Sequence, residues 1–303
     1  MEAAARKMST RHAWDAATPV PIQALVHGVE APLTIDGSCI MDNRERYEHC
    51  IAALNAGYPV LKGTNNRVFS APCVLVGSGP SVKDHLEDIR ERYERGEEII
   101  AIKGAHDWLI ENGIVPRAAF ALDPQQSRAK CFKKLHKQVL YLCASQMHPD
   151  TWEHMRGYQV LVWHSRIEAG QEKLPGWDTQ LIVQNCSTSG NSALLLMHWL
   201  GRRRFEVYGF DSSIPVPRGP IGRLMARLRG RLMKIDGARV PPEKRIFEVT
   251  VGDQRFQTTA ELVSQVVEIH PLLKMLGRLR LTAHGEGYFQ AVIAAGKANG
   301  WPI

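Results

Sequence analysis

The 303-residue sequence contains no apolar run approaching the roughly 18–20 consecutive residues that a membrane-spanning helix requires. The start of the chain, Met1–Asp15, carries charges but lacks the apolar core of a secretory signal. The six cysteines form no CxxC pair, which argues against a metal cluster, and Cys73, Cys143 and Cys186 lie in or beside apolar runs. Without an export signal we expect reduced, buried thiols and a cytoplasmic protein with no transmembrane segment.

An excess of basic over acidic residues is found only in a single segment of the chain. The chain holds 38 basic and 31 acidic residues, a net charge of +7. Nine of the basic residues and only two of the acidic ones lie in residues 215–245, so the rest of the chain is neutral. Any partner that recognises basicity is therefore expected to contact this segment.

Within residues 215–245, apolar side chains recur at helical spacing while Arg223, Arg227 and Arg231 lie on another face, which predicts an amphipathic helix. Three functions compete: a lid that closes on phosphates, a contact with an anionic membrane, and a contact with nucleic acid. The alternative without function is a solvated face above a packed apolar stripe. Flanking glycines and prolines suit a mobile insertion, so we favour a lid among the functional interpretations.

From Ala71 onward, short apolar strands alternate with helical stretches, as in βαβ units of a mainly parallel sheet covered on both faces. In such sheets ligands bind at the carboxyl ends of the strands, near the point where the strand order reverses. The predicted strands are Cys73–Val76, Ile99–Ile102, Ala118–Leu122, Val139–Cys143, Gln159–Trp163, Leu181–Gln184 and Phe205–Tyr208. The predicted helices are Ser81–Tyr93, His106–Asn112 and Asn191–Leu200.

We divide the chain into four parts: 1–66, 67–214, 215–245 and 246–303. The first is expected to be an N-terminal extension that acts as an appendage or partner-facing layer, with irregular structure at Ala13–Ile22 and Val29–Ile40 and a helix at Asn43–Ala56. The second is the nucleotide-binding α/β core, and the third is the basic insertion. The last part completes the domain with a hairpin (Phe247–Val251 and Arg255–Thr258), a helix near Thr259–Leu276, a strand at Leu279–Thr282 and a final helix.

The turn after the first core strand has the composition of a phosphate-binding turn. Glycines let the backbone approach a ligand closely, and a helix N-terminus offers free N–H groups to a phosphate. Ser81 followed by Asp84 is a plausible capping box for that helix. The alternative is a tight turn without a ligand. The candidate ligand-binding residues here are Gly77, Ser78, Gly79, Pro80 and Ser81.

Two aspartates directly follow strands of the predicted sheet. Asp123 ends the third strand, and Asp211 follows the strand Phe205–Tyr208. A carboxylate at the ligand-facing edge can bind Mg²⁺, accept from a ribose hydroxyl, or act as a base. We therefore predict Asp123 and Asp211 as catalytic residues and metal ligands. The alternative is that both only cap the turns that follow them.

A second polar turn precedes an apolar helix and contains Ser189, Gly190 and Asn191. These residues are predicted to bind the ligand as another anion-binding turn, although ordinary N-capping explains the spacing equally well. His164 and His284 also fall at predicted strand ends, where a histidine could donate to a leaving group. We include His284 among the candidate catalytic residues, while structural histidines are the alternative for both.

The ordered set of motifs resembles a known family. It runs through Val76–Ser81, Leu109–Pro116, Leu122–Pro124, Ser189–Ala193, Leu200–Gly201, Tyr208–Asp211, Phe256–Thr259 and His284–Gly287. Over about residues 45–303 the chain is similar to the archaeal 6-hydroxymethylpterin diphosphokinase family, whose related domains occur in motility-associated flagellin glycosyltransferases and in phage and bacterial proteins of unassigned role. The resemblance implies a Rossmann-like fold and a nucleotide donor, which in the diphosphokinase is ATP with Mg²⁺.

The glycine turn and the final Gly-x-Asp are also similar to those of bacterial sialyltransferases that use a CMP-sugar. Two departures from the pattern limit what the resemblance implies. Lys103 and Gly104 replace an expected Asn-type residue, and the basic insertion stands where relatives often place acceptor-contacting side chains. The resemblance therefore supports the use of a nucleotide more strongly than it supports any particular acceptor.

The leading hypothesis is a diphosphokinase-like transferase that passes diphosphate from ATP to a hydroxymethyl-type acceptor, with Mg²⁺ as cofactor. The second is a glycosyltransferase that uses a CMP- or UDP-sugar. The third is a non-catalytic protein that binds a nucleotide or a partner, with an anionic partner on residues 215–245. The sequence does not fix the oligomeric state.

Overall fold

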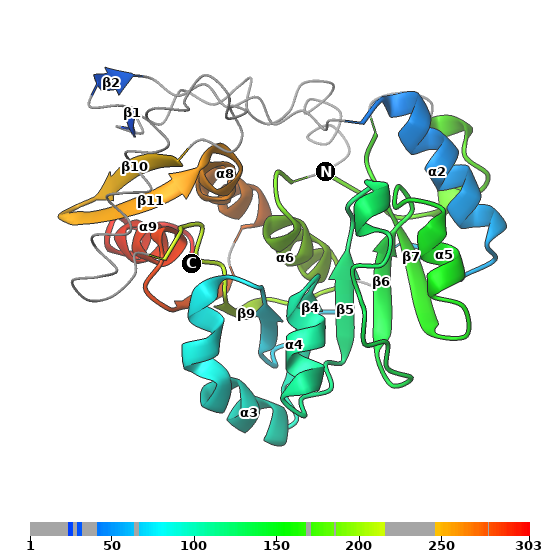
Figure 1. Cartoon of the computed structure of the whole chain (residues 1–303), viewed down its shortest axis with the longest axis horizontal. Coiled ribbons are helices and arrows are strands. Elements are labelled where there is room, and N and C mark those ends of the chain that lie inside the picture. Colours follow the sequence, from blue (N-terminus) through cyan, green and yellow to red (C-terminus); the bar gives the residue numbers. More distant parts are fainter. Residues whose placement is uncertain are drawn as a thin grey trace.

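The computed structural model describes residues 24–26, 29–31, 41–63, 67–167, 171–184, 186–215, 246–277 and 279–303 (Figure 1). Its centre is an eight-stranded sheet in the order β12-β9-β3-β4-β5-β6-β7-β8. Every neighbouring pair in this sheet is parallel. The strands are β3 (Cys73–Val76), β4 (Glu98–Ile102), β5 (Ala118–Ala121), β6 (Leu140–Ala144), β7 (Gln159–Ser165), β8 (Ile182–Val183), β9 (Arg204–Tyr208) and β12 (Arg280–His284).

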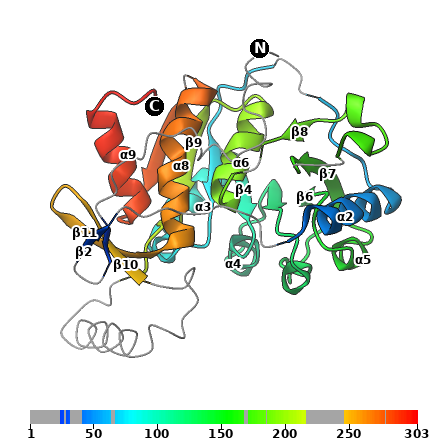
Figure 2. The same cartoon turned by 90° about the horizontal axis from the view of Figure 1, so that it is seen from above.

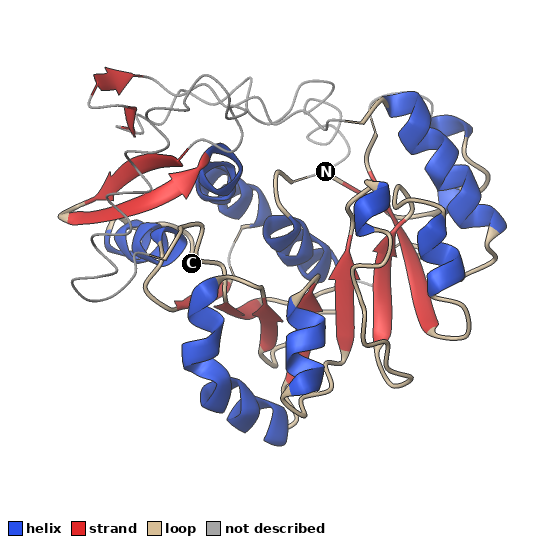
Figure 3. Ribbon diagram, viewed as in Figure 1, coloured by secondary structure: helices blue, strands red, loops and turns tan. Residues whose placement is uncertain are grey.

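Helices lie on both faces of this sheet, and α4 and α6 lie on opposite sides of β4 (Figure 2). The helices are α2 (Asn43–Asn55), α3 (Leu86–Glu94), α4 (Ala105–Glu111), α5 (Asp150–His154), α6 (Ser189–Trp199), α8 (Ala260–Leu276) and α9 (Tyr288–Ala298). Short 3₁₀ helices are η1 (Pro80–His85), η2 (Gln126–Arg128), η3 (Gln171–Lys173) and η4 (Trp177–Thr179). This arrangement confirms the predicted α/β Rossmann-like fold (Figure 3).

The inner strands β3 to β6 form because each is a short, mainly apolar run that is buried on both sides. All four residues of β3 are buried, including Cys73, and so is Cys143 in β6, as expected for small core residues. Between the sheet and its helices, Phe120 and Trp163 stack with their ring centroids 5.3 Å apart. Strand β3 is followed along the chain by β4 to β8 on one side, while β9 and β12 lie on the other. The strand order therefore reverses between β3 and β9.

A second, four-stranded sheet has the order β11-β10-β1-β2 and is antiparallel throughout. Its hairpin, β10 (Ile246–Val251) and β11 (Gln254–Thr259), was predicted, as were the helix α8, the strand β12 and the helix α9. The strands β1 (Ala24–Val26) and β2 (Val29–Ala31) were not predicted. The prediction of irregular structure from Val29 onward is wrong over β2, because these residues pair with β1 in an antiparallel ladder.

The helix α2 was expected to belong to a peripheral extension, and the structure corrects this. Its Cys50 and Ala53 are completely buried, and His49 contacts the Gln146 carbonyl oxygen at 3.0 Å just after β6. The Arg46 guanidinium donates to Gln146 Oε1 at 2.6 Å. The helix is thus part of the packed α/β body, because its buried face covers the ends of β6 and β7. The four domain boundaries themselves stay predictions.

Two further sequence-based expectations concern the basic segment and the absence of a membrane-spanning helix. The basic segment 216–245, with the predicted amphipathic helix, lies outside the described residues. Among the helices that the structure does describe, none combines the length and the apolar character that crossing a membrane would take.

Candidate functional site

Three loops meet where the strand order reverses, at the carboxyl ends of β3, β9 and β12. The backbone N–H of Gly77 donates to the Tyr208 carbonyl at 2.8 Å, and that of Gly79 donates to the Gly209 carbonyl at 2.9 Å. The turn after β3 is therefore hydrogen-bonded to the turn after β9. This is the edge at which the sequence placed the ligand site.

The two glycines are required by this close approach of the backbones. A Cβ at Gly77 would lie 2.6 Å from the Gly209 carbonyl oxygen, and a Cβ at Gly79 would lie 2.6 Å from the same atom. Gly209 itself has a φ of +64°, in the left-handed region that favours glycine. Packing between the two turns thus explains both glycines without a ligand.

Asp211 occupies the position that the sequence assigned to a phosphate. Its Oδ2 accepts the backbone N–H of Ser81 at 2.7 Å, and its Oδ1 accepts from the Ser81 hydroxyl. The side-chain amide of Gln290 adds a third donor, 3.2 Å from Oδ1. A carboxylate of the protein therefore lies at the first turn of η1, where an anion is stabilised by free N–H groups.

The predicted capping box of Ser81 with Asp84 is wrong. The residue before η1 is Gly79, which has no side chain to cap with, and the Ser81 hydroxyl donates to Asp211 instead. Pro80 starts the 3₁₀ helix and Ser78 is exposed. Ser78 and Pro80 are therefore the exposed residues of this turn.

In the second predicted anion-binding turn, as in the first, a carboxylate of the protein accepts the hydrogen bonds of the turn. Thr188 caps α6 by accepting the backbone N–H of Asn191 at 3.4 Å. The carboxylate of Glu268, from α8, accepts the Ser187 N–H at 3.0 Å and the Asn191 side-chain amide at 2.9 Å. A Cβ at Gly190 would lie 2.6 Å from the Gln265 side chain, so this turn is also packed against α8. Ser189 opens the helix and is half-buried.

Burial raises the pKa of Glu268 above its ordinary value, although the hydrogen bonds from Asn191 and Ser187 lower it. Because the folded pKa lies above the unfolded one, the folded state holds this proton more tightly. The stabilisation from this carboxyl is complete below the unfolded pKa of 4.5 and is lost as pH rises through the folded pKa.

We therefore expect Glu268→Gln to gain stability relative to the wild type as pH rises from 4.5 towards neutrality. Urea unfolding of both proteins across this pH range measures the difference. If the wild type instead became more stable relative to the variant as pH rises, the raised pKa of Glu268 would be contradicted.

The more open part of the edge holds Lys103, after β4, and Asp123, after β5. Lys103 Nζ lies 3.3 Å from Asp123 Oδ2, and the two side chains are 33% and 22% exposed. Lys103 has a φ of +48°, which is unusual for a residue with a Cβ and sets the direction of its side chain. A Cβ at the next residue, Gly104, would lie 4.0 Å from Ser78 Cβ, so this pair adjoins the turn after β3. In such a pair the ammonium group can neutralise the charge of a donor phosphate, and the carboxylate can accept a proton.

The contacts of Asp211 and Asp123 do not fit the predicted magnesium site. Both oxygens of Asp211 already accept hydrogen bonds, and the Asp123 carboxylate faces the ammonium group of Lys103. Mg²⁺ requires oxygen ligands that are free to coordinate it. No group of three or more metal-binding side chains occurs among the residues that the structure describes. The role of Mg²⁺ stays a prediction.

The imidazole of His284 lies against the α3 layer rather than beside either aspartate. It stacks on the Tyr208 ring at 4.2 Å, and its Nε2 lies 2.9 Å from Glu206 Oε2. Its carbonyl oxygen accepts from the Gln290 amide that also reaches Asp211. His284 therefore helps to hold the edge together, and its catalytic role stays a prediction.

His164 lies away from solvent altogether. Its ring is completely buried, with Nδ1 2.8 Å from Ser145 Oγ and Nε2 2.7 Å from Gln180 Oε1. Burial lowers its pKa, which favours the neutral form. These contacts support the structural alternative for His164.

The sequence-based reasoning missed the partners that come from distant helices. Gln265 and Glu268 of α8 and Gln290 of α9 all lie at the edge, and Lys103 had been noted only as a departure. Gln265 and Glu268 are spaced one helical turn apart in a helix rich in apolar residues, a pattern that could have indicated a buried polar contact.

Comparison with known proteins adds the following findings. The family model described as 6-hydroxymethylpterin diphosphokinase MptE-like matches residues 51–216, more than half of the chain. Among solved structures, the MAf glycosyltransferase from Magnetospirillum magneticum AMB-1 is similar in fold, with a TM-score of 0.55 and 17% identity over 82% of this chain. This chain spans only 38% of that glycosyltransferase. No curated protein matches it.

Proposed function

We propose that this chain, which belongs to the 6-hydroxymethylpterin diphosphokinase MptE-like family, is a transferase. The group that it transfers would come from a nucleotide donor. The observation that carries the proposal is the pair Lys103 and Asp123, partly exposed beside Ser78 at the carboxyl edge next to the strand-order reversal. Open α/β sheets bind nucleotides at this edge. The first candidate reaction is diphosphate transfer from ATP to an acceptor hydroxyl.

In this reaction the acceptor oxygen forms a bond to the β-phosphorus of ATP, and the bond between the α,β-bridging oxygen and the β-phosphorus breaks, releasing AMP. Lys103 would contact the phosphate oxygens and offset their charge. Asp123, released from Lys103, would accept the proton of the attacking hydroxyl. The turn after β3 adjoins this pair.

A second candidate is glycosyl transfer from a CMP- or UDP-sugar. It is favoured by the contacts of Asp211 and Asp123, which leave neither carboxylate free as a metal ligand. In this reaction the acceptor oxygen bonds to the anomeric carbon while the bond from that carbon to the phosphate oxygen breaks. Lys103 would then stabilise the departing phosphate, and Asp123 would again take the acceptor proton.

Thermal shift with ATP, CTP, UTP, a CMP-sugar and a UDP-sugar, each with and without Mg²⁺, tests the proposal. A donor at a hundred times its Kd stabilises the fold by about 2.7 kcal/mol. AMP formation with ATP and Mg²⁺ supports the first candidate, and release of CMP or UDP supports the second. If no nucleotide shifts the melting temperature, the transferase proposal fails and a non-catalytic binding protein replaces it.

Replacing Lys103 by glutamine is expected to raise the Kd of the donor at least about tenfold, because a hydrogen bond to a charged group contributes roughly 1.5–3 kcal/mol. Isothermal titration calorimetry with the nucleotide identified above measures the change. Lys134→Gln is the matched control, since Lys134 is 50% exposed and pairs with Glu111 on the outside of α4. Equal affinities of Lys103→Gln and the wild type would remove Lys103 from the site.

A further inference from the structure

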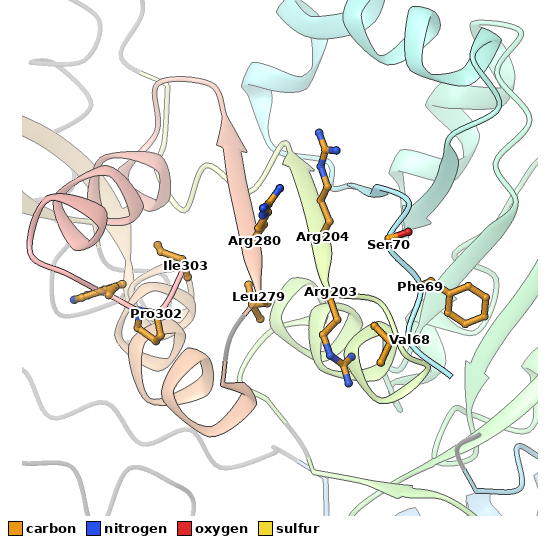
Figure 4. A pocket seen from close by; sticks show the side chains of 10 residues that line it. Val68, Phe69, Ser70, Arg203, Arg204, Leu279, Arg280, Pro302 and Ile303 are labelled. Atoms are coloured by element: carbon orange, nitrogen blue, oxygen red, sulfur yellow. The ribbon is translucent and has the colours of Figure 1, made fainter. Parts of the chain in front are cut away.

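A separate hollow lies at the opposite, amino-terminal edge of the central sheet (Figure 4). Its volume is ≈ 680 Å³, within the range of small-molecule sites. It is bordered by the residues before β3, the first residues of β9 and β12, and the segment after α9. Because β9 has five residues, about 16 Å of strand separates this hollow from the carboxyl edge.

Two arginines stand side by side in this hollow. Arg204 and Arg280 are paired positions in the register of the parallel strands β9 and β12, so their side chains leave the same face of the sheet. Their side chains extend in the same direction, whereas that of Arg203 extends the other way (Figure 4). Like charges on directly neighbouring strand positions destabilise a sheet unless an anion compensates them.

The protein supplies only part of that compensation. Arg204 Nε lies 3.5 Å from Glu206 Oε1, and the Arg204 side chain is 46% exposed. The same carboxylate also contacts His284 at 2.9 Å and Arg92 at 3.5 Å. Arg280 is exposed and makes no ion pair with any acidic residue that the structure describes. Arg92 also pairs with Glu97 at 2.9 Å and with Asp88 at 3.4 Å, so Glu206 is the carboxylate that Arg204 contacts, while Arg280 pairs with none among the described residues.

Apolar side chains line other parts of the same hollow. Val68 is 60% exposed, one of the most exposed large apolar side chains among the described residues, and Pro302 and Ile303 are half-buried on the other side. In Figure 4 Val68 and the pair Pro302 and Ile303 lie on either side of Leu279. A guanidinium fork beside an apolar border matches a phosphate group attached to an apolar body.

We propose that this hollow binds a phosphorylated organic ligand, with the phosphate between Arg204 and Arg280 and the apolar body against Val68 and Ile303. This hollow and the proposed transferase site lie at opposite edges of the sheet. The binding does not depend on the proposed catalytic activity.

Calorimetry with naphthyl phosphate, naphthol and orthophosphate tests the proposal on the full chain. The wild type is expected to bind naphthyl phosphate at least tenfold more tightly than either fragment, and Arg280→Gln and Arg204→Gln are each expected to raise that Kd at least tenfold. Arg44→Gln is the matched control, because Arg44 is 84% exposed and pairs with Glu48 on α2. Its Kd is expected to equal that of the wild type.

Lys103→Gln separates this site from the transferase site and is expected to leave naphthyl phosphate binding unchanged. The proposal is overturned if both arginine variants bind as tightly as the wild type, if naphthol binds as tightly as its phosphate, or if the wild type does not bind at millimolar concentration. A loss confined to Lys103→Gln would assign the binding to the carboxyl edge and also overturn it. Melting curves check that the arginine variants are folded. Removing one of two adjacent like charges is not expected to lower the melting temperature.

Discussion

Replacing Gly79 by alanine is expected to lower the free energy of unfolding by about 3 kcal/mol, the upper range for overpacking a rigid contact. The new Cβ would lie 2.6 Å from the Gly209 carbonyl oxygen, 2.7 Å from Asp211 Oδ2 and 2.9 Å from the Gly209 carbonyl carbon. None of these atoms is the flexible end of a long side chain. The backbone of Gly79, with φ −62° and ψ 152°, is open to any residue, so the whole effect comes from contact. Urea unfolding measures it.

Gly104→Ala is the matched control for this experiment. Gly104 lies in the neighbouring loop with φ −61°, and the nearest atom to its new Cβ would be Ser78 Cβ at 4.0 Å. Its free energy of unfolding is expected to stay within about 0.5 kcal/mol of the wild type, since alanine also restricts the unfolded chain. Equal stabilities of the two variants would show that the turns after β3 and β9 are not packed as described.

This contact changes how glycine variants of the turn should be interpreted. A bulky substitution at Gly79 is expected to disturb the fold, and with it any nucleotide binding, whether or not a nucleotide contacts the turn. Loss of binding in such a variant therefore says nothing about phosphate recognition. Lys103 is the better probe of the ligand site because its side chain is one-third exposed and contacts a single carboxylate.

Much of the fold could be predicted because parallel strands buried on both faces leave a simple sequence signal. The run Cys73–Val76 is apolar throughout and forms β3 with the predicted ends. The positions of Asp123 and Asp211 at the ligand-facing edge followed from the same rule, since each comes just after a strand. The short strands β1 and β2 have three residues each and escaped prediction, because they join the sheet through the pairing of β1 with β10, more than two hundred residues away.

The contacts that define the site depend on long-range pairing, which local sequence does not reveal. Ser81 and Asp211 are 130 positions apart, and Asn191 and Glu268 are 77 apart. Each pair joins a strand–helix turn to an acidic residue that only the folded chain brings near. The left-handed backbone of Lys103 is equally invisible in the sequence, because lysine has no preference for that conformation.

The two turns that the sequence marked as phosphate-binding share one arrangement. In each, backbone or side-chain donors near a helix start are satisfied by a carboxylate from elsewhere in the chain, Asp211 in one and Glu268 in the other. A carboxylate and a phosphate require the same donors, so the composition of such a turn does not distinguish them. The proposed ligand binding at this edge therefore rests on Lys103 and Asp123 rather than on the glycine turns.

Replacing Asp211 by alanine is expected to cost about 3 kcal/mol in the free energy of unfolding. The change leaves three donors without their acceptor, namely the Ser81 N–H, the Ser81 hydroxyl and the Gln290 amide, and each unsatisfied buried group costs roughly 1–3 kcal/mol. Asp123→Ala is the control. Its carboxylate is 22% exposed and its partners stay accessible to water, so a cost of about 1 kcal/mol or less is expected. Urea unfolding compares the two variants.

The same variant tests whether Asp211 stands where a phosphate would bind. Alanine leaves a cavity lined by the three donors, and orthophosphate can accept from all of them. Orthophosphate should then raise the melting temperature of Asp211→Ala more than that of the wild type, and more than chloride at equal ionic strength does. Equal shifts in both proteins would mean that this turn accepts a carboxylate only, and that its likeness to a phosphate-binding turn lies in its glycines and not in its chemistry.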